Sequence, residues 1–210
     1  PVDFFTIYDS KRKEIKLNKN IILIMAGGKG KRLQPFTSIL PKPLIPVKGK
    51  PVILHIMNMF KSDGFNKFYI SINNKNNVLK SYLSEMSKMY NLSFLKENNP
   101  LGSAGALKKI IKIKETFFVV NCDGLLKLSP NQLLNFHKEN KNDLTLVAAL
   151  KKFSVPYGVC EVNKLNGKLN KMEEKPQKNV IANAGLYICE PKIFKYLPAK
   201  KSFGMNELIK

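Results

Sequence analysis

A glycine- and lysine-rich stretch, GGKGKR at residues 27–32, follows the first continuous apolar run of the sequence. Glycines let a backbone approach a ligand closely, and backbone N–H groups with basic side chains attract anions. The P-loop pattern would need Ser or Thr where Arg32 stands, and the dinucleotide fingerprint would need glycine in place of Leu33. The stretch therefore predicts a phosphate site of another kind, although alone it fits a glycine-rich turn with exposed lysines equally well.

A second basic residue, Lys42, stands between Pro41 and Pro43 in the segment PKPLIPV, residues 41–47. Proline fixes its own φ, so this stiff segment has little backbone freedom to lose when the lysine binds a ligand. The segment supports the anion-binding interpretation of the glycine-rich stretch.

Both stretches resemble the opening motif of the sugar-1-phosphate nucleotidylyltransferases, G-G-x-G-x-R-L-x-P-x-T followed by P-K-P-L-x-P-V. Every fixed position of that motif is matched. Five later elements are similar to family elements in the same order: LGSAGAL at 101–107, NCD at 121–123, YGV at 157–159, EKP at 174–176 and NAG at 183–185. The resemblance covers about residues 21–209.

The resemblance implies a reaction that joins a nucleoside triphosphate to a sugar 1-phosphate and releases pyrophosphate. A phosphate oxygen of the sugar attacks the α-phosphorus in line, so no covalent protein nucleophile is needed. The protein must hold two polyanions together and stabilise the charge of the transition state, which calls for backbone amides, fixed cations and a metal. The implied partners are these two substrates, and the implied cofactor is Mg²⁺.

The resemblance also implies roles for individual residues. The catalytic residues would be Arg32, Lys42, Asp123 and Lys175. The metal ligand would be Asp123, because a hard ion prefers carboxylate and phosphate oxygens. The nucleotide would contact Ala26, Gly27, Gly28, Gly30, Glu97 and Gly102. Residues 101–107 resemble guanylyl- and uridylyltransferases more than the short thymidylyltransferases, and Glu97 is placed where it can contact the base. We expect GTP, with UTP and dTTP as the alternatives.

On the sugar side, the resemblance assigns the sugar's phosphate to Lys175 and a sugar hydroxyl to Glu174. The pocket would be lined by Tyr157, Gly158, Asn183 and Gly185. Taken alone, an adjacent Glu174 and Lys175 would usually be a solvated pair. Asp123 taken alone would more often be a turn residue after a strand. His55 and His137 lie on apolar helical faces without ligand spacing, so we expect them to be structural.

The chain departs from the family near its end. Family members usually share the metal with a second Asp beyond the equivalent of residues 205–209, but no Asp follows Asp143. We expect a truncated version of a longer protein; otherwise the second ligand is not needed or comes from elsewhere. Because of the missing carboxylate, a catalytically silent regulatory domain that binds nucleotide remains an alternative function.

Two further departures concern other segments. Gly124 replaces an apolar residue, which we expect to loosen the loop after Asp123, and residues 1–20 resemble the linker after a regulatory CBS pair.

Alternating strands and helices must position these residues. Apolar runs predict strands at 21–25, 68–72, 92–95, 117–120, 144–150 and 185–189. Helical spacing predicts helices over 53–60, 78–86, 103–111 and 130–137, with none before Pro51 because of the prolines. Repeated β-α-β units imply a doubly wound, mostly parallel, Rossmann-like α/β sheet with helices on both faces. An Asn166-Gly167 turn between runs at 157–162 and 169–173 predicts a hairpin, and we expect the second half to add mixed strands to the sheet edge.

Length and composition fit one domain, with residues 1–20 as a tail or linker and 21–210 as the catalytic domain. The 36 Lys and Arg against 15 Asp and Glu give a charge of +21, yet the lysines are scattered and only Arg12 and Arg32 are arginines. This argues against a nucleic-acid partner, which remains a third alternative.

No apolar run approaches the ~20 residues of a membrane helix. Three cysteines without C-x-x-C spacing favour a reducing cytoplasm. A homo-oligomer is left open.

Overall fold

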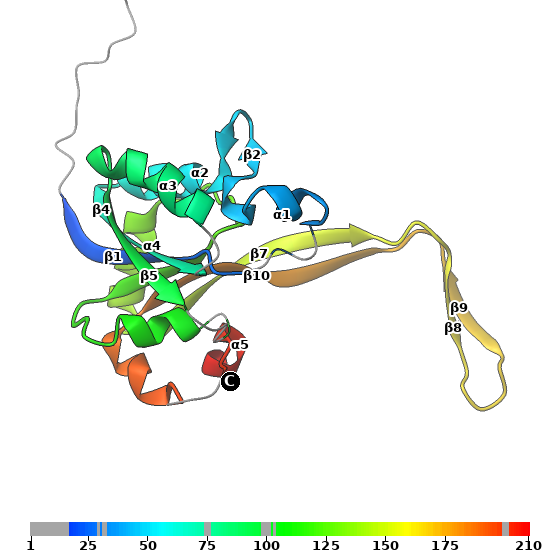
Figure 1. Cartoon of the computed structure of the whole chain (residues 1–210). Helices are drawn as coiled ribbons and strands as arrows, with labels where there is room; N and C mark the ends of the chain where they lie inside the picture. Colours follow the sequence, from blue (N-terminus) through cyan, green and yellow to red (C-terminus); the bar gives the residue numbers. More distant parts are fainter. Residues whose placement is uncertain are drawn as a thin grey trace, which may run out of the picture. The chain divides into compact units, whose positions relative to one another are not determined.

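The computed structural model describes residues 17–28, 30, 33–73, 77–97, 102, 104–198 and 202–210. The chain forms two compact units (Figure 1). The sheet unit comprises Pro1–Thr145 and Leu186–Lys210, and the hairpin unit comprises Leu146–Gly185. No helix in the described part of the chain is both long enough and apolar enough to cross a bilayer.

A six-stranded sheet has the order β5-β4-β1-β6-β10-β7. Its strands are β1 (Asn18–Met25), β4 (Phe65–Asn73), β5 (Asn91–Glu97), β6 (Phe117–Asn121), β7 (Leu144–Ser154) and β10 (Gln177–Cys189). β1 runs parallel to β4 and β6, β4 runs parallel to β5, and β10 runs antiparallel to β6. The chain moves outward from β1 through β4 to β5 and then crosses to the other side of β1. A topological switch point therefore lies between β1 and β6.

Helices and 3₁₀ turns connect these strands. The α-helices are α1 (Phe36–Ile39), α2 (Val52–Ser62), α3 (Asn77–Glu85), α4 (Pro130–Glu139) and α5 (Met205–Ile209). The 3₁₀ turns are η2 (Lys42–Leu44), η3 (Met86–Lys88), η4 (Gly105–Lys109) and η5 (Pro191–Tyr196), and β2 (Pro46–Val47) pairs with β3 (Lys50–Pro51). Figure 1 shows α2 and α3 on one face of the sheet and α5 on the other. The predicted doubly wound, mostly parallel α/β fold is confirmed.

The core lies on both faces of the sheet, because β1 is buried on both. On one face, the ring of Phe60 from α2 packs edge-on against Phe118 of β6, with the centroids 5.1 Å apart. On the other face, Leu23 of β1 belongs to a cluster that includes Phe194 of η5 and Met205 of α5. Burial on both faces explains why the run at 21–25 is continuously apolar rather than alternating.

Several predicted elements differ from the structure. β4 begins at Phe65 rather than at Phe68, and β10 begins at Gln177 rather than at Gly185. β1 begins at Asn18 rather than at Ile21. The proline-rich segment holds α1 and η2 before Pro51, because proline at the start of a helical turn gives up an N–H that has no partner there. The helix expected over 103–111 is the 3₁₀ helix η4, tightened by i to i+3 bonds such as that from Leu107 N to Ala104 O (3.1 Å). The predicted cap, Ser103, lies outside the described residues.

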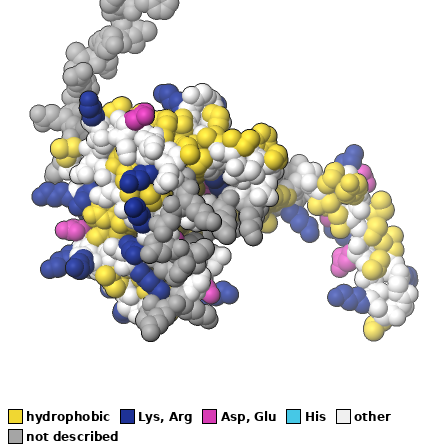
Figure 2. All heavy atoms as spheres, viewed as in Figure 1, with side chains coloured by type: hydrophobic (Ala, Val, Ile, Leu, Met, Phe, Trp, Pro, Cys, Tyr) yellow, Lys and Arg dark blue, Asp and Glu magenta, His cyan; other side chains and the backbone are white. Residues whose placement is uncertain are grey.

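The hairpin unit contains the predicted β-hairpin, but its strands form a separate two-stranded sheet and are not added to the edge of the six-stranded sheet. β8 (Val159–Val162) pairs antiparallel with β9 (Leu169–Glu173), and the turn between them includes Gly167 at φ +70°. Hydrophobic side chains, shown in yellow in Figure 2, lie exposed along these strands, as at Met172 (60% exposed) and Leu169 (53%). Lysine side chains, in dark blue, are spread over the face shown in Figure 2.

Candidate active site

A cavity of about 370 Å³ opens in the sheet unit where β1, β4, β5 and β6 end. It is lined by Met25, Gly27, Gly28, Gly30, Lys42, Ser71, Glu97, Gly102, Asn121, Cys122 and Asp123. Ligands of doubly wound sheets bind at the carboxyl ends of the strands beside a switch point, which is where this cavity lies. The structure therefore brings together most of the residues predicted for the nucleotide side.

The glycine-rich loop is shaped by close contacts at Gly30. This residue has φ +63°, its carbonyl accepts a hydrogen bond from Thr37 Oγ1 (2.9 Å), and a β-carbon there would lie 2.8 Å from Thr37 Cγ2. Glycine is therefore required for both conformation and space. Ala26 is buried and does not line the cavity; its N–H donates to Ser71 O (3.2 Å). The predicted catalytic residue Arg32 lies outside the described residues.

Lys42 forms an ion pair with Oδ2 of Asp123 at the cavity. The lysine belongs to η2, where Pro43 and Leu44 are buried and Leu44 N donates to Pro41 O (2.8 Å). The backbone of Lys42 is therefore fixed while its side chain remains 26% exposed. The stiff presentation of this lysine to a ligand stays a prediction.

Cys122, next to Asp123, is a buried thiol. Burial, and then the neighbouring Asp123 carboxylate, raise the pKa of Cys122 from 9.0 to about 12. The thiol is therefore neutral at physiological pH and cannot serve as a nucleophile.

Glu97 ends β5 and is half-buried in the cavity wall. Burial raises the pKa of its carboxyl group above the ordinary value of 4.5, against the lowering effects of a hydrogen bond with Ser71 and the charge of Lys109. Its Oε1 atom lies 3.3 Å from where a β-carbon of Gly27 would stand. Glu97 thus places a hydrogen-bond acceptor on the wall of the cavity, beside the glycine-rich loop.

The Gly102 loop is supported by a segment that no sequence motif pointed to. Gly102 has φ +81°, and a β-carbon there would lie 2.4 Å from the carbonyl oxygen of Phe203. The same oxygen accepts a hydrogen bond from Ala104 N (2.9 Å). Because the contact joins backbone atoms of distant segments, no sequence pattern predicts it.

Ser71 was not predicted either, although the sequence carries a signal for it. It is a single polar residue within the apolar end of β4, and it is 1% exposed while lining the cavity. A buried hydroxyl in an apolar strand needs a hydrogen-bond partner. That requirement could have suggested a role at the site.

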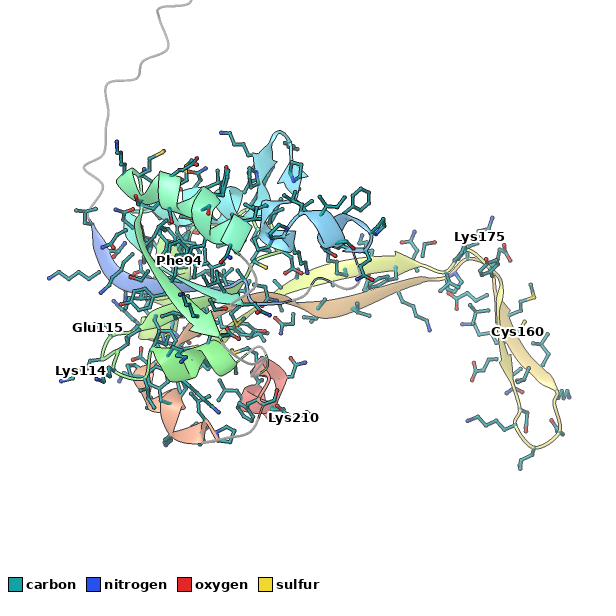
Figure 3. The ribbon with its side chains drawn as sticks, viewed as in Figure 1. Phe94, Lys114, Glu115, Cys160, Lys175 and Lys210 are labelled. Carbon is teal, nitrogen blue, oxygen red and sulfur yellow. The ribbon has the colours of Figure 1, made fainter. Side chains whose placement is uncertain are left out.

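The residues predicted for the sugar side all lie in the hairpin unit. Lys175, labelled in Figure 3, adopts φ +47°, and its N–H donates to the carbonyl of Tyr157 (3.2 Å). Its Nζ lies 4.0 Å from Oε1 of Glu174, and both side chains are about two-thirds exposed (66% and 64%). A β-carbon on Gly158 would lie 3.0 Å from Oε2 of Glu174. The structure therefore brings these four residues into one corner of the hairpin unit.

Asn183 and Gly185 form a second, local arrangement in β10. Gly185 has φ +73°, and its N–H donates to Oδ1 of Asn183 (2.8 Å). The asparagine side chain stabilises the irregular backbone next to it. Its role in a sugar pocket stays a prediction.

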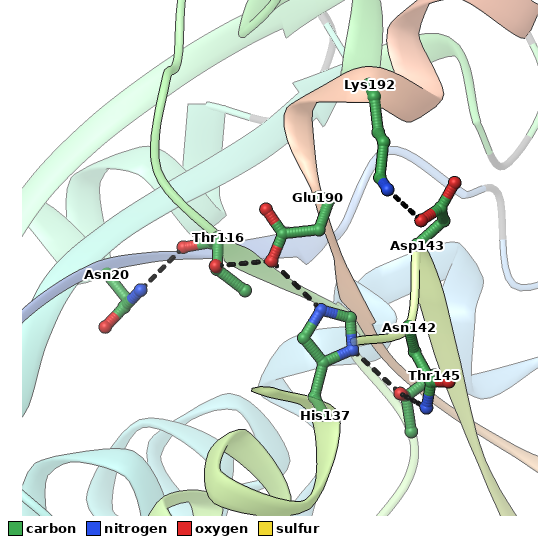
Figure 4. Close-up of polar contacts among 8 residues, drawn as sticks. All are labelled: Asn20, Thr116, His137, Asn142, Asp143, Thr145, Glu190 and Lys192. Carbon is green, nitrogen blue, oxygen red and sulfur yellow. Dashed lines mark hydrogen bonds and ion pairs between the residues drawn. The ribbon is translucent and has the colours of Figure 1, made fainter. Parts of the chain in front are cut away.

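The two histidines make structural contacts, as predicted. His55 Nε2 lies 2.7 Å from the carbonyl of Val47. His137 is 1% exposed, with Nδ1 2.8 Å from Thr145 Oγ1 and Nε2 3.1 Å from Glu190 Oε1 (Figure 4). Both ring nitrogens of His137 are therefore engaged within the fold.

The sequence model of the nucleotidyl transferase family matches residues 21–208. The chain belongs to this family. Among its curated relatives, the mannose-1-phosphate guanyltransferase of Yarrowia lipolytica is 35% identical over 179 residues, 81% of this chain and 49% of that protein. Mannose-1-phosphate guanylyltransferase 1 of Arabidopsis thaliana is 31% identical over 180 residues, 81% of this chain and 50% of that protein. The chain thus spans about half the length of the curated relatives it matches.

Solved structures share the fold. HddC from Yersinia pseudotuberculosis, complexed with GMP-PN, has a TM-score of 0.67 and 27% identity, covering 89% of this chain and 83% of that one. A UDP-glucose pyrophosphorylase complexed with UDP-glucose has a TM-score of 0.64 at 20% identity, covering 90% and 85%, which supports the fold alone. The resemblance to sugar-1-phosphate nucleotidylyltransferases is confirmed.

Proposed function

We propose that this chain transfers a guanylyl group from GTP to a sugar 1-phosphate, giving a GDP-sugar and pyrophosphate. The observation that carries the proposal is one cavity lined by the glycine-rich loop, Lys42, Asp123 and Glu97. Relatives named mannose-1-phosphate guanyltransferase make mannose 1-phosphate the first candidate for the sugar. UTP and dTTP are the alternative nucleotides.

The cavity can hold the triphosphate through charge and backbone groups. Lys42 supplies a cation on a fixed backbone, and the glycine loop allows close approach of phosphate oxygens. A phosphate oxygen of the sugar then attacks the α-phosphorus in line, and pyrophosphate leaves. Catalysis rests on positioning and charge stabilisation. It needs no protein nucleophile, in keeping with the neutral Cys122 thiol.

Asp123 offers the kind of ligand that the proposed Mg²⁺ prefers, a carboxylate oxygen. Among the described residues, no group of three His, Cys, Asp or Glu side chains could hold a metal. Asp123 offers one carboxylate, 43% exposed, and substrate phosphates commonly complete the coordination of Mg²⁺. When bound, the ion would neutralise charge on the reacting phosphates.

Glu97 supports the choice of GTP. An ionised carboxylate only accepts hydrogen bonds. Guanine presents two adjacent donors, N1–H and the N2 amino group, whereas uracil and thymine present one N3–H between two carbonyls. The carboxylate in the cavity wall is therefore matched to guanine, and it would repel the carbonyl oxygens of the pyrimidines.

The test is formation of GDP-mannose from GTP and mannose 1-phosphate, comparing two lysines of the hairpin unit. Lys175 and Lys171 are similarly exposed (66% and 65%), and each lies near a glutamate. Lys175→Ala should reduce turnover by about 10²-fold, the scale of a lost transition-state contact. Lys171→Ala should change it by less than about twofold.

Equal turnover in both variants would contradict the role proposed for Lys175. GTP binding by the unmodified chain without pyrophosphate release would instead support the silent regulatory alternative.

We also propose a cytoplasmic location. The thiols of Cys122, Cys160 and Cys189 are free, as is usual in a reducing compartment.

A further inference from the structure

We propose that Lys42 is ion-paired, in the free protein, with the Asp123 carboxylate that binds the metal. The triphosphate then draws the Lys42 side chain away from Asp123, so that nucleotide and metal bind cooperatively. This inference rests on the proposed function. It concerns the exchange of ion-pair partners when the nucleotide binds: Lys42 moves from Asp123 to the triphosphate, and Asp123 becomes available to the metal.

The two residues come from distant segments of the chain. Lys42 belongs to η2 and Asp123 follows β6, 81 residues later in the chain. The lysine ammonium contacts Oδ2 of Asp123, while the stem of the lysine passes beside the glycine loop, with Cβ 3.4 Å from the position of a β-carbon on Gly30. The lysine side chain therefore extends from beside the glycine loop, expected to bind phosphate, to the carboxylate expected to bind metal.

A lysine in this position opposes metal binding to the free protein. A divalent cation needs oxygens of Asp123, and the ammonium already contacts one of them. Even at Oδ1, the ion would stand a few ångströms from a unit positive charge, which repels it. Because Asp123 and Glu97 are the acidic residues in the described lining of the cavity, little else there offsets this repulsion.

The triphosphate supplies the competing partner for Lys42. It carries several negative charges and arrives at the adjacent glycine loop. The lysine stem is flexible and its ammonium has three donors, whereas its backbone is fixed in η2. The side chain can therefore turn from Asp123 to phosphate without any backbone movement. Asp123 is then free to bind the metal that accompanies the nucleotide, and the coupling between the two ligands is reciprocal.

The first measurement uses Mn²⁺ alone as the probe, followed by electron paramagnetic resonance without nucleotide. Lys42→Met should bind Mn²⁺ about tenfold more tightly than the unmodified protein, because a positive charge next to the site is removed. Adding Asp123→Asn to Lys42→Met should abolish the gain. Lys50→Met, which removes an exposed lysine of β3 outside the cavity lining, should leave Mn²⁺ affinity unchanged.

The second measurement uses GTP binding in EDTA. Asp123→Asn should tighten GTP binding about tenfold in the unmodified background, and much less in the Lys42→Met background, because the effect acts through release of Lys42. Circular dichroism of each variant verifies folding. Equal gains in both backgrounds, or equal Mn²⁺ affinity of Lys42→Met and the unmodified protein, would overturn the inference.

These binding results are separable from the proposed function. The predicted Mn²⁺ and GTP effects without any GDP-sugar formation would support the exchange and contradict the proposed reaction. GDP-sugar formation with Mn²⁺ affinity insensitive to Lys42→Met would support the reaction and contradict the exchange.

Discussion

The Glu97 carboxylate lies 3.3 Å from the position that a β-carbon would take on Gly27. Glu97 ends β5 and Gly27 follows the end of β1, and their proximity joins the glycine-rich loop to the wall that carries the acceptor. The absence of a side chain at residue 27 therefore allows Glu97 to keep its place. This relationship connects the phosphate-binding part of the cavity to the part proposed to select the base.

Gly27→Ala tests this relationship. The added methyl group would press on the carboxylate, so Glu97 would have to shift by a few tenths of an ångström. We expect the ratio of kcat/KM for GTP to that for UTP to fall about three- to tenfold, on the scale of a small misplacement of a binding group. Gly28→Ala is the control, because a β-carbon there has nothing of the protein within 4 Å. A GTP-to-UTP ratio that changes equally in both variants would count against the relationship.

Glu97→Gln tests selection of the base. The amide keeps the shape but replaces one acceptor oxygen by a donor. The ratio of kcat/KM for GTP to that for UTP should fall by about tenfold or more, because a polar group would then be mispaired. An unchanged ratio would show that other residues choose the base.

The pH dependence of this preference has a definite sign. The charged acceptor form of Glu97 is the one matched to guanine. Because burial raises the pKa of Glu97 above 4.5, the preference for GTP should be lost on acidification at a higher pH than an exposed glutamate would give. Initial rates with GTP and UTP across a pH series measure it. Loss at or below pH 4.5 would contradict the assignment.

Gly102→Ala tests the support given by Phe203. The substituted residue would combine φ +81° with a β-carbon 2.4 Å from a backbone oxygen, so we expect destabilisation of about 1–3 kcal/mol and weaker GTP binding. Gly49→Ala is matched, because Gly49 has φ +76° but open space around it. Urea unfolding should show a larger loss for Gly102→Ala. Equal losses would mean that the Phe203 contact adds nothing.

The cysteines give a test of burial. Iodoacetamide at mildly alkaline pH should label the exposed Cys160 and spare the buried Cys122 and Cys189, as read by mass spectrometry. Since the pKa of Cys122 is raised from 9.0 to about 12, its thiol ionises more readily in the unfolded chain. The stability that this group contributes is fully present below pH 9.0 and is lost as pH rises toward 12. Rapid labelling of native Cys122 would contradict this burial.

Local patterns in the sequence predicted the fold and several residues that line the cavity. The apolar run before Gly27 and the amphipathic spacing of α2 specify elements whose neighbours are close in the chain, and the prolines around Lys42 fix its presentation locally. These features depend on interactions between residues a few positions apart. The sequence pattern is therefore sufficient to predict them.

The remaining features arise from contacts between distant segments. The Lys42–Asp123 ion pair spans 81 residues, and the Gly102 loop is supported by the backbone of Phe203, which no side-chain pattern encodes. The helix predicted over 103–111 became the 3₁₀ helix η4 for a related reason. Gly102 and Gly105 weaken helical propensity, and the bond from Ala104 N to Phe203 O draws the start of the turn out of an α-helical pattern.

Pyrophosphate release from each pair of a nucleoside triphosphate and a sugar 1-phosphate, with Mg²⁺ present, decides whether the proposed reaction is correct. The nucleotides would be GTP, UTP, dTTP and ATP, and the sugars mannose, glucose and galactose 1-phosphates. We expect release to be fastest with GTP and mannose 1-phosphate and to require both substrates. Release that is faster with UTP or dTTP, or no release with any pair, would contradict the proposal.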